Sequence, residues 1–419
     1  MNISRNDIEI MAPVGSFESL IASVQAKTDA VYFGIGNLNM RSASTINFNI
    51  NDLKNISNIC KEHNIKSYLT LNTIIYDNDI NAMKDIISAA IENKIDSIIA
   101  SDFAVIEEAI RQGICIHCST QLNISNRYAV KYFSQFADVI VLARELNLEQ
   151  AADIHNFIIE NNIKGPSGNL IKIEMFIHGA LCMAISGKCY LSLHHYNKSA
   201  NRGACLQDCR REYDVYVATE KEENYQLNIE NKHIMSPKDL CTLPFLDRII
   251  NAGARVLKIE GRGRSPEYVK RVVETYNIAL EHIINDSYTD EIINKLVGKV
   301  SEVFNRGFWG GYYLGKTMGE WTEKHSSSAT KQKEFIGVGT NYFSKLGVGE
   351  FLIQTGKVQV GDEVIIVGPT TGVLELTIKE LHNDNGPTTI ATKGERFAIP
   401  VPQKTRKNDK IYKLTAKRN

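Results

Sequence analysis

The sequence predicts an α/β fold, a (β/α)8 TIM-like barrel with a cysteine-bearing insertion, followed by a small C-terminal antiparallel β-barrel. Over the first 280 residues, short apolar runs alternate with amphipathic helical patterns. Some runs, such as Val139–Leu142, are apolar at every position, which is typical of strands buried on both faces. From residue 333 the pattern changes to short alternating strands with glycine turns. An open, doubly wound sheet is the alternative for the first part.

Eight candidate strands precede residue 261. They are Ile8–Pro13, Ala30–Gly34, Lys66–Asn72, Ser97–Ser101, Ile114–Asn123, Asp138–Arg144, Ile171–His178 and Ala254–Glu260. Helical patterns occur at Phe17–Ala26, Ile50–His63, Ile80–Asn93, Leu148–Asn161 and Ser265–Ile284. The last of these has a proline in its first turn, where the missing N–H costs nothing. Eight strands with intervening helices are the number that closes this type of barrel.

The chain is predicted to divide into three parts. Residues 1–325 form the large barrel, residues 326–332 a linker and residues 333–419 the small β-barrel. The linker prediction rests on the polar, serine-rich stretch Glu320–Gln332, which lacks any helical or strand period. Residues 180–241 are too many for an ordinary loop. We interpret them as an insertion at the C-terminal end of a strand, where such barrels hold their chemistry.

Composition limits the possible functions. The 48 basic and 48 acidic residues cancel, so affinity for nucleic acid would have to come from a local patch. The first ten residues lack the basic start and apolar core of a signal peptide. Apolar runs also stay below the roughly 18 residues that span a bilayer. We expect a cytoplasmic protein without a membrane segment. In that reducing compartment, eight cysteines favour metal or redox chemistry, or buried thiols, over disulfides.

Five cysteines gather in the insertion. They are Cys182, Cys189, Cys205, Cys209 and Cys241. Thiolates are the usual ligands of iron–sulfur clusters, which normally need four. Nearby glycines at 179, 187 and 203 would let the backbone pass close to a cluster. The spacing alone leaves a cluster, structural zinc and unrelated buried thiols open. The other three, Cys60, Cys115 and Cys118, are expected to be core thiols.

Charged and amide side chains end several predicted strands, where a barrel collects its catalytic groups. The catalytic candidates are His178, Arg144, Glu145, Lys258 and Glu260. The candidates for binding substrate are Arg41, Asn72, Gln121, Asn123 and Arg262. A histidine can relay a proton, and arginine and lysine can hold a carboxylate or phosphate. The alternatives are an internal ion-pair network that closes the barrel, and amides that cap helices.

Two groups of basic residues are candidates for contact with RNA phosphates. One consists of Arg210, Arg211, Arg262, Arg264 and Lys270, and the other of Lys404, Arg406, Lys407, Lys410, Lys413, Lys417 and Arg418. A small β-barrel attached through a linker is a plausible RNA-docking module. A solvated basic tail is the alternative. The sequence contains neither G-x-S-x-G nor H-E-x-x-H, the common hydrolase motifs.

The stretch EMFIHGALCMAISGKCYLS, residues 174–192, resembles the signature of the collagenase-like peptidase family of unknown catalytic type. Other matching pieces are MAPVGSFESL, DAVYFG, STQLN, LARELNLEQ, KIEGR, YVKRVVETY and FNRGFWGGYY. The resemblance covers essentially the whole chain. Its length and layout look most like the tRNA 5-hydroxyuridine branch of that family.

The resemblance implies RNA hydroxylation without dioxygen, most specifically formation of 5-hydroxyuridine at the tRNA wobble position. It implies a 4Fe-4S cluster on Cys182, Cys189, Cys205 and Cys241, with Cys209 as the alternative ligand. It also suggests prephenate as the source of the hydroxyl group, so the expected partners are tRNA and a small acidic co-substrate. A collagenase-type peptidase and a zinc-stabilised, non-catalytic RNA-binding protein are the competing hypotheses.

Overall fold

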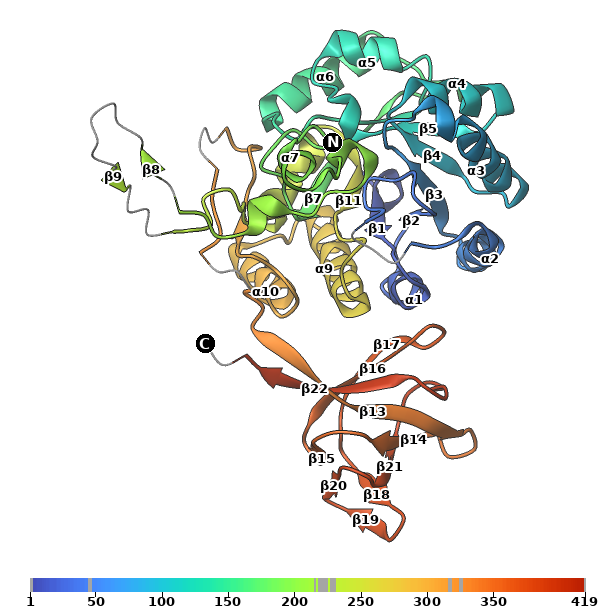
Figure 1. Ribbon diagram of the computed structural model, residues 1–419, viewed down its shortest axis with the longest axis vertical. Coiled ribbons are helices and arrows are strands. Elements are labelled where there is room, and N and C mark those ends of the chain that lie inside the picture. Colours follow the sequence, from blue (N-terminus) through green and yellow to red (C-terminus); the bar gives the residue numbers. More distant parts are fainter. Residues whose placement is uncertain are drawn as a thin grey trace.

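The computed structural model describes residues 3–43, 47–214, 216–217, 225–226, 231–315, 319–323 and 327–417. Eight parallel strands form a closed barrel in which β7 pairs with β11 (Figure 1). The strands are β1 (Glu9–Pro13), β2 (Ala30–Gly34), β3 (Lys66–Leu71), β4 (Ser97–Ala100), β5 (Cys115–Cys118), β6 (Val139–Val141), β7 (Lys172–Gly179) and β11 (Ala254–Ile259). The predicted barrel is confirmed, and the open sheet is excluded by this closure.

Helices surround the barrel because each buries an apolar stripe against the outer face of the strands. They are α1 (Phe17–Gln25), α2 (Leu53–Glu62), α3 (Ile80–Glu92), α4 (Phe103–Gln112), α5 (Arg127–Phe133), α6 (Leu148–Glu160), α8 (Leu246–Asn251) and α9 (Pro266–Ile284), with α10 (Asp290–Ser301) beside α9. The predicted helices agree to within a few residues. The fifth strand is shorter than predicted, because a 3-10 helix begins at Thr120.

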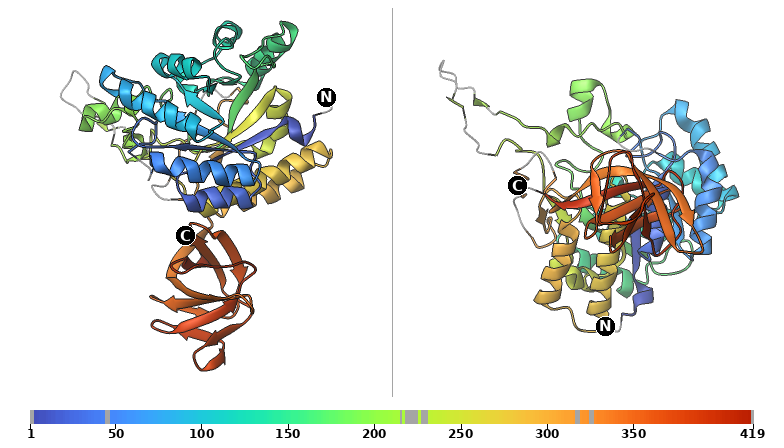
Figure 2. Two further views of the ribbon diagram at one scale, coloured as in Figure 1. Left: turned by 90° about the vertical axis from the view of Figure 1, so that its right-hand side faces the viewer. Right: turned by 90° about the horizontal axis from the view of Figure 1, so that it is seen from below.

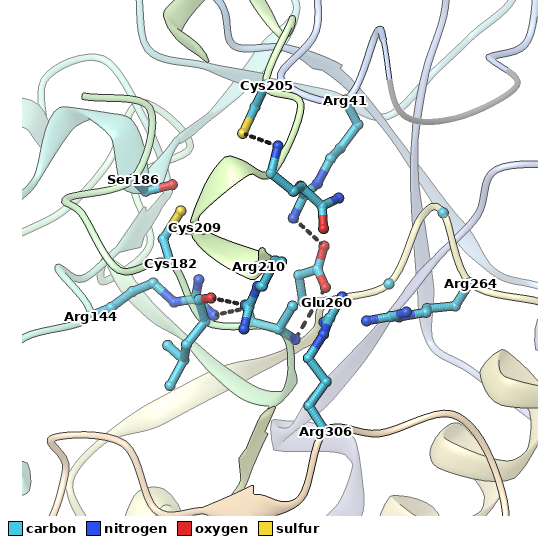
Figure 3. A pocket seen from close by; sticks show the side chains of 15 residues that line it. Arg41, Arg144, Cys182, Ser186, Cys205, Cys209, Arg210, Glu260, Arg264 and Arg306 are labelled. Atoms are coloured by element: carbon cyan, nitrogen blue, oxygen red, sulfur yellow. Dashed lines mark hydrogen bonds and ion pairs between the residues drawn. The ribbon is translucent and has the colours of Figure 1, made fainter. Parts of the chain in front are cut away.

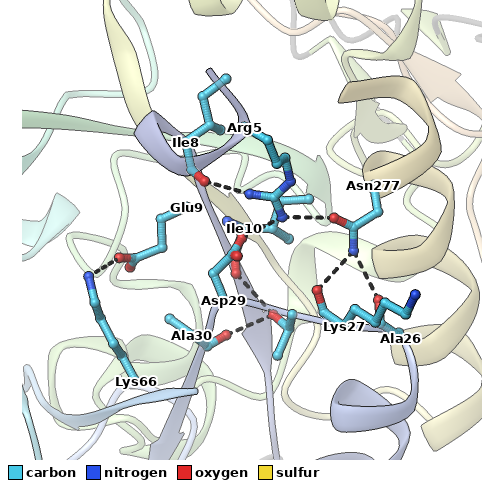
Figure 4. Close-up of polar contacts among 11 residues, drawn as sticks. Arg5, Ile8, Glu9, Ile10, Ala26, Lys27, Asp29, Ala30, Lys66 and Asn277 are labelled. Carbon is cyan, nitrogen blue, oxygen red and sulfur yellow. Dashed lines mark hydrogen bonds and ion pairs between the residues drawn. The ribbon is translucent and has the colours of Figure 1, made fainter. Parts of the chain in front are cut away.

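The N-terminal ends of the strands are closed by polar contacts (Figure 4). Arg5 donates to Asp29 Oδ2 and to Asn277 Oδ1, each at 2.8 Å, and so ties the chain start to α9. Asp29 also accepts the backbone N–H of Ile10 at 2.7 Å. These bonds pair groups that would otherwise lie unsatisfied at the barrel floor.

The insertion between β7 and β11 lies over the opposite, C-terminal end of the barrel. It contains α7 (Leu191–Tyr196), the short strands β8 (Tyr216–Val217) and β9 (Tyr225–Gln226), and β10 (Asp239–Cys241). Strand β10 pairs antiparallel with β7 and parallel with β12 (Phe308–Trp309). Two loops anchor the insertion at the mouth: Ile74 N–H donates to the carbonyl of Asn201 at 3.1 Å, and Gln121 donates to Ser186 Oγ at 3.1 Å.

The C-terminal domain is an antiparallel β structure (Figure 2). Its strands are β13 (Lys331–Phe343), β14 (Val348–Ile353), β15 (Lys357–Gln359), β16 (Glu363–Gly368), β17 (Gly372–Thr377), β18 (Leu381–Asn383), β19 (Gly386–Thr388), β20 (Ile390–Thr392), β21 (Arg396–Pro400) and β22 (Lys410–Ala416). It docks on α1, where the Gln25 amide exchanges 2.9 Å bonds with the Thr371 carbonyl and the Val373 N–H. Strand β13 begins at Lys331, inside the predicted linker.

Two of the segments predicted from sequence include residues that the structure does not describe. Residue 326 of the predicted linker and Arg418 of the basic tail lie outside the described residues. Within the described part of the chain, every helix is too short or too polar to cross a membrane.

Candidate functional site

Four cysteines line one cavity at the mouth of the barrel. Cys182, Cys189, Cys205 and Cys209 surround a space of about 150 Å3, here called the thiol pocket. Its floor is formed by side chains from the upper ends of the strands, among them Tyr32, Asn72, Gln121, Phe176, Lys258 and Arg262. The insertion therefore supplies the sulfur atoms and the barrel supplies the polar floor.

The local backbone explains how thiols widely spaced in sequence meet. Gly187 and Gly203 have φ of +80° and +76°, a region that favours glycine. A side chain at Gly203 would have its Cβ 2.1 Å from the backbone oxygen of Asn39, so the insertion can approach the β2 loop only through a glycine here. The N–H of Gln207 donates to Cys205 Sγ at 3.4 Å, a contact that stabilises a thiolate.

The electrostatics of these thiols reflect burial and mutual proximity. Loss of solvent raises the pKa of Cys182, and Arg41 and Arg144 partly oppose that rise. Burial raises the pKa of Cys209 to about 11, with Arg210 lowering it and the three other pocket thiols adding to it. Several thiolates in so small a space need nearby positive charge. Arginines that line the pocket contribute part of it, and a metal centre would supply the rest and displace the protons.

Cys241, a member of the predicted ligand set, does not line this pocket. It ends β10, opposite His178 of β7, and it is buried with a pKa raised by burial to about 12. Its thiol faces the hydroxyl of Tyr276 on α9. Strand β10 pairs antiparallel with the end of β7, and this pairing places Cys241 against α9 instead of at the thiol pocket. The structure brings Cys209 to the pocket in its place.

The remaining three cysteines differ in their burial. Cys60 and Cys118 are buried in the core, as predicted. Cys115 is exposed at the start of β5, so its prediction as a core thiol is wrong. Strand positions three apart face opposite sides, and here one side is solvent at the strand end.

A second cavity of about 140 Å3 adjoins the thiol pocket and shares three of its cysteines (Figure 3). Its cationic lining consists of Arg41, Arg144, Arg210, Arg264 and Arg306, and we call it the arginine pocket. Acidic groups at this point are Glu260 and Asp239, the latter 3.4 Å from Arg306. Five guanidinium groups against two carboxylates leave net positive charge, so the arginine pocket suits a small anionic ligand.

Glu260 is the anionic centre of the arginine pocket. Its Oε1 accepts from Arg41 at 2.7 Å and its Oε2 accepts the N–H of Ala180 at 3.2 Å. Burial raises the pKa of this carboxyl, but Arg41, Arg264 and Arg144 outweigh it and bring the pKa to about 2. Glu260 is therefore ionised at neutral pH, and its carboxylate pairs with Arg41.

Arg144 differs from the other arginines. Its Nη2 donates to the carbonyl of Ala180 at 3.2 Å, and its guanidinium lies 4.1 Å from the ring centroid of Phe176. Burial lowers its pKa. Among the described residues, no group accepts a hydrogen bond from its buried Nε. A buried donor without a protein partner indicates a place where a ligand oxygen could bind.

Lys258 lies deeper, in the barrel interior. Its Nζ is 2.7 Å from Glu174 Oε1, and Glu174 Oε2 is 3.4 Å from His117 Nδ1. Burial raises the pKa of Glu174, while Lys258 and His117 together lower it below its usual value. Sequence reasoning missed Glu174 and His117. The signal was a carboxylate flanked by the apolar residues Ile173 and Met175 in a buried strand, since a buried charge needs a partner.

The amide candidates and Arg262 form a connected floor. Asn72 Nδ2 donates to Gln121 Oε1 at 3.1 Å, and Gln121 in turn reaches Ser186 of the insertion. Arg262 Nη1 donates to Thr70 Oγ1 at 2.8 Å and is buried. These contacts connect the floor of the thiol pocket to the cysteine-bearing loop. Asn72 and Gln121 therefore support the insertion and also line the cavity where a ligand could bind.

Three predicted residues lie outside both pockets. His178 is buried against Tyr268, Tyr276 and Phe308, and burial lowers its pKa to about 3. Its Nδ1 lies 3.4 Å from the Tyr276 hydroxyl, and β10 pairs with its strand end. Glu145 is exposed in the turn after β6, and Asn123 ends a 3-10 helix with φ of +54°.

The geometry defines a class of protein: a TIM-like barrel whose mouth is covered by a thiol-bearing insertion. The sequence profile of peptidase family U32 matches residues 15–323. The chain belongs to this family.

Three similar proteins carry different names. A protein named collagenase from Porphyromonas gingivalis is 53% identical over 414 residues, 99% of each chain. A tRNA hydroxylation protein of Bacillus subtilis is 30% identical over 389 residues, 90% of this chain and 87% of the relative. A 23S rRNA 5-hydroxycytidine synthase of Escherichia coli is 33% identical over 290 residues, 68% of this chain and 41% of the relative.

Proposed function

We propose that this chain is an iron–sulfur protein that hydroxylates RNA, most specifically at C5 of a tRNA wobble uridine and without dioxygen. The observation that carries the proposal is the meeting of four insertion cysteines in one cavity, beside a cavity lined by arginines. The names of the tRNA and rRNA relatives support RNA as the substrate.

The thiol pocket offers four cysteines, the number of thiolates that a 4Fe-4S cluster needs. Cys182, Cys189, Cys205 and Cys209 would hold it, with Cys209 replacing Cys241 in the set that the family resemblance implies. When bound, the cluster supplies electron transfer. Structural zinc is bound tetrahedrally by thiolates with Zn–S bonds of about 2.3 Å, which places the sulfur atoms about 3.8 Å from one another. Among the described residues, no three potential ligands are placed to share a single ion.

The arginine pocket would bind the small acidic co-substrate, for which prephenate is the candidate implied by the family resemblance. Arg144 would place its unpartnered Nε–H against a carboxylate oxygen. Arg264 and Arg306 would neutralise the remaining charge, since both line the cavity. Glu260 would keep Arg41 in place, and Phe176 would hold the Arg144 guanidinium plane. A dicarboxylate bound here would lie beside the thiols.

A collagenase-type peptidase is the second candidate, because the relative with 53% identity bears that name. A zinc-stabilised, non-catalytic RNA-binding protein is the third. One anaerobic purification with metal and acid-labile sulfide analysis separates the three. We expect brown protein with absorption near 400 nm and about equal amounts of iron and sulfide. Colourless protein with stoichiometric zinc, or metal-free protein that cleaves gelatin, would contradict the proposal.

A further inference from the structure

The first part of the insertion, residues 180–207, has basic residues but no acidic ones. From Ala180 to Gln207 the sequence has no aspartate or glutamate, although the whole chain has 48 acidic and 48 basic residues. The same stretch contains Lys188, Lys198 and Arg202. Arg210 and Arg211 follow beside Asp208 and Glu212, so basic residues outnumber acidic ones by five to two over residues 180–212. A neutral protein therefore concentrates positive charge around the thiol pocket, where a polyanion would meet it first.

Large apolar side chains are exposed in the same place. Tyr190 is 77% exposed and stands between Cys189 and Leu191, both of which line the thiol pocket. Tyr196 at the end of α7 is 41% exposed, and Tyr76 on the neighbouring β3 loop is 57% exposed. Exposed aromatic rings grouped at a cavity rim mark an interaction surface.

Two of these rings are held by arginines. The Arg202 guanidinium lies 4.2 Å from the ring centroid of Tyr76, and Arg202 is anchored by the carbonyl of Ile74 at 2.7 Å. Asp79 forms an ion pair with the same guanidinium. Arg211 lies 5.3 Å from the Tyr196 ring and donates to its hydroxyl at 2.6 Å. The rings are thereby fixed at the rim while part of each remains open to solvent.

We propose that this rim, consisting of Tyr76, Tyr190, Tyr196, Arg202 and Arg211 and here called the tyrosine rim, binds an unpaired stretch of RNA by stacking its bases. The inference rests on the proposed function and names how the substrate is held. Tyrosine and arginine planes are the surfaces on which proteins stack splayed bases, and adjacent lysines bind the phosphates. Tyr190, which follows Cys189 of the thiol pocket, would flank the base that faces this pocket.

The charge of the surface favours RNA over a protein partner. Protein interfaces have cores depleted in lysine, whereas Lys188 and Lys198 are exposed on both sides of Tyr190. An RNA loop with unstacked bases offers both rings for the tyrosines and phosphates for these lysines.

The test measures affinity for a short RNA hairpin with an unpaired loop, and for the same strand fully paired. We expect Tyr190→Ala to weaken hairpin binding about tenfold, because one stacked base contributes this much. Tyr190→Phe should bind as the unmutated protein does, since the ring remains. The matched control is Tyr128→Ala on α5, a residue 70% exposed with Arg127 5.6 Å from its ring, which should change nothing.

Iron content is measured in every variant, because Tyr190 neighbours Cys189. If Tyr190→Ala loses iron, Tyr76→Ala provides the same comparison at a residue outside the insertion. Unchanged hairpin affinity in the iron-loaded alanine variants would show that the tyrosine rim does not bind unpaired RNA. If such variants still hydroxylate RNA, the proposed function survives that result. If the unmutated protein neither binds the hairpin nor modifies RNA, the function fails and the rim fails with it.

Discussion

Cys209→Ala is expected to lose most of its iron and sulfide after anaerobic purification, whereas Cys241→Ala is expected to keep both. The reason is placement: Cys209 lines the thiol pocket with Cys182, Cys189 and Cys205, while Cys241 is buried against Tyr276. Loss of one thiolate opens an iron site, and incomplete clusters are readily lost. We expect the same loss in alanine variants of the three other pocket cysteines.

The matched controls are Cys60→Ala and Cys118→Ala, which remove buried core thiols without touching the pocket. Each should keep its iron. Because Cys241 is also buried, Cys241→Ser serves as a second variant if the alanine protein folds poorly. Iron retained in Cys209→Ala and lost in both Cys241 variants would show that Cys241 is the fourth ligand. In that case the β10 edge would have to rearrange when the cluster binds.

Arg144→Lys is expected to fold and keep its cluster, yet to lose about a hundredfold in hydroxylation rate. Arg144 Nε has no acceptor among the described residues, and its guanidinium plane is held over Phe176. A carboxylate can use two parallel N–H donors of arginine, and a lysine ammonium cannot reproduce this fork. Misplacing a bound reactant by about 1 Å costs roughly this factor. Nucleoside mass spectrometry of tRNA, sampled over time, measures the rate.

Arg111→Lys is the control for that variant, because Arg111 lies on the exposed face of α4 and pairs only with its neighbour Glu108 among the contacts that the structure gives. It should hydroxylate RNA at the unmutated rate. Normal hydroxylation in Arg144→Lys would show that this arginine does not bind the ligand and has only a structural role beneath the insertion.

The fold could be predicted because strands of a parallel barrel carry a local signal. A run such as Val139–Leu142 is apolar throughout, since both faces of β6 are buried. Eight such runs fix the strand number, and closure follows from it. The end of β5 could not be placed, because the change to a 3-10 helix at Thr120 depends on contacts with the insertion through Gln121.

The site could be predicted only in part, because its geometry depends on long-range contacts. The arginine pocket draws on separate segments of the chain, and no spacing in sequence announces that Arg41 and Arg306 line one cavity. The position of Cys241 depends on the antiparallel pairing of β10 with β7, which a strand of three residues does not signal in sequence. His178 lies one residue before the end of β7, where β10 pairs with that strand, and it is buried.

The central claim is that this chain hydroxylates RNA. The most direct measurement is nucleoside mass spectrometry of total tRNA and rRNA from cells that lack their own gene of this family and produce this chain without oxygen. We predict 5-hydroxyuridine in tRNA, absent from the same cells carrying the Cys182→Ala protein. If the nucleosides of both strains are identical, although the unmutated protein is present with its iron, RNA hydroxylation is not its activity.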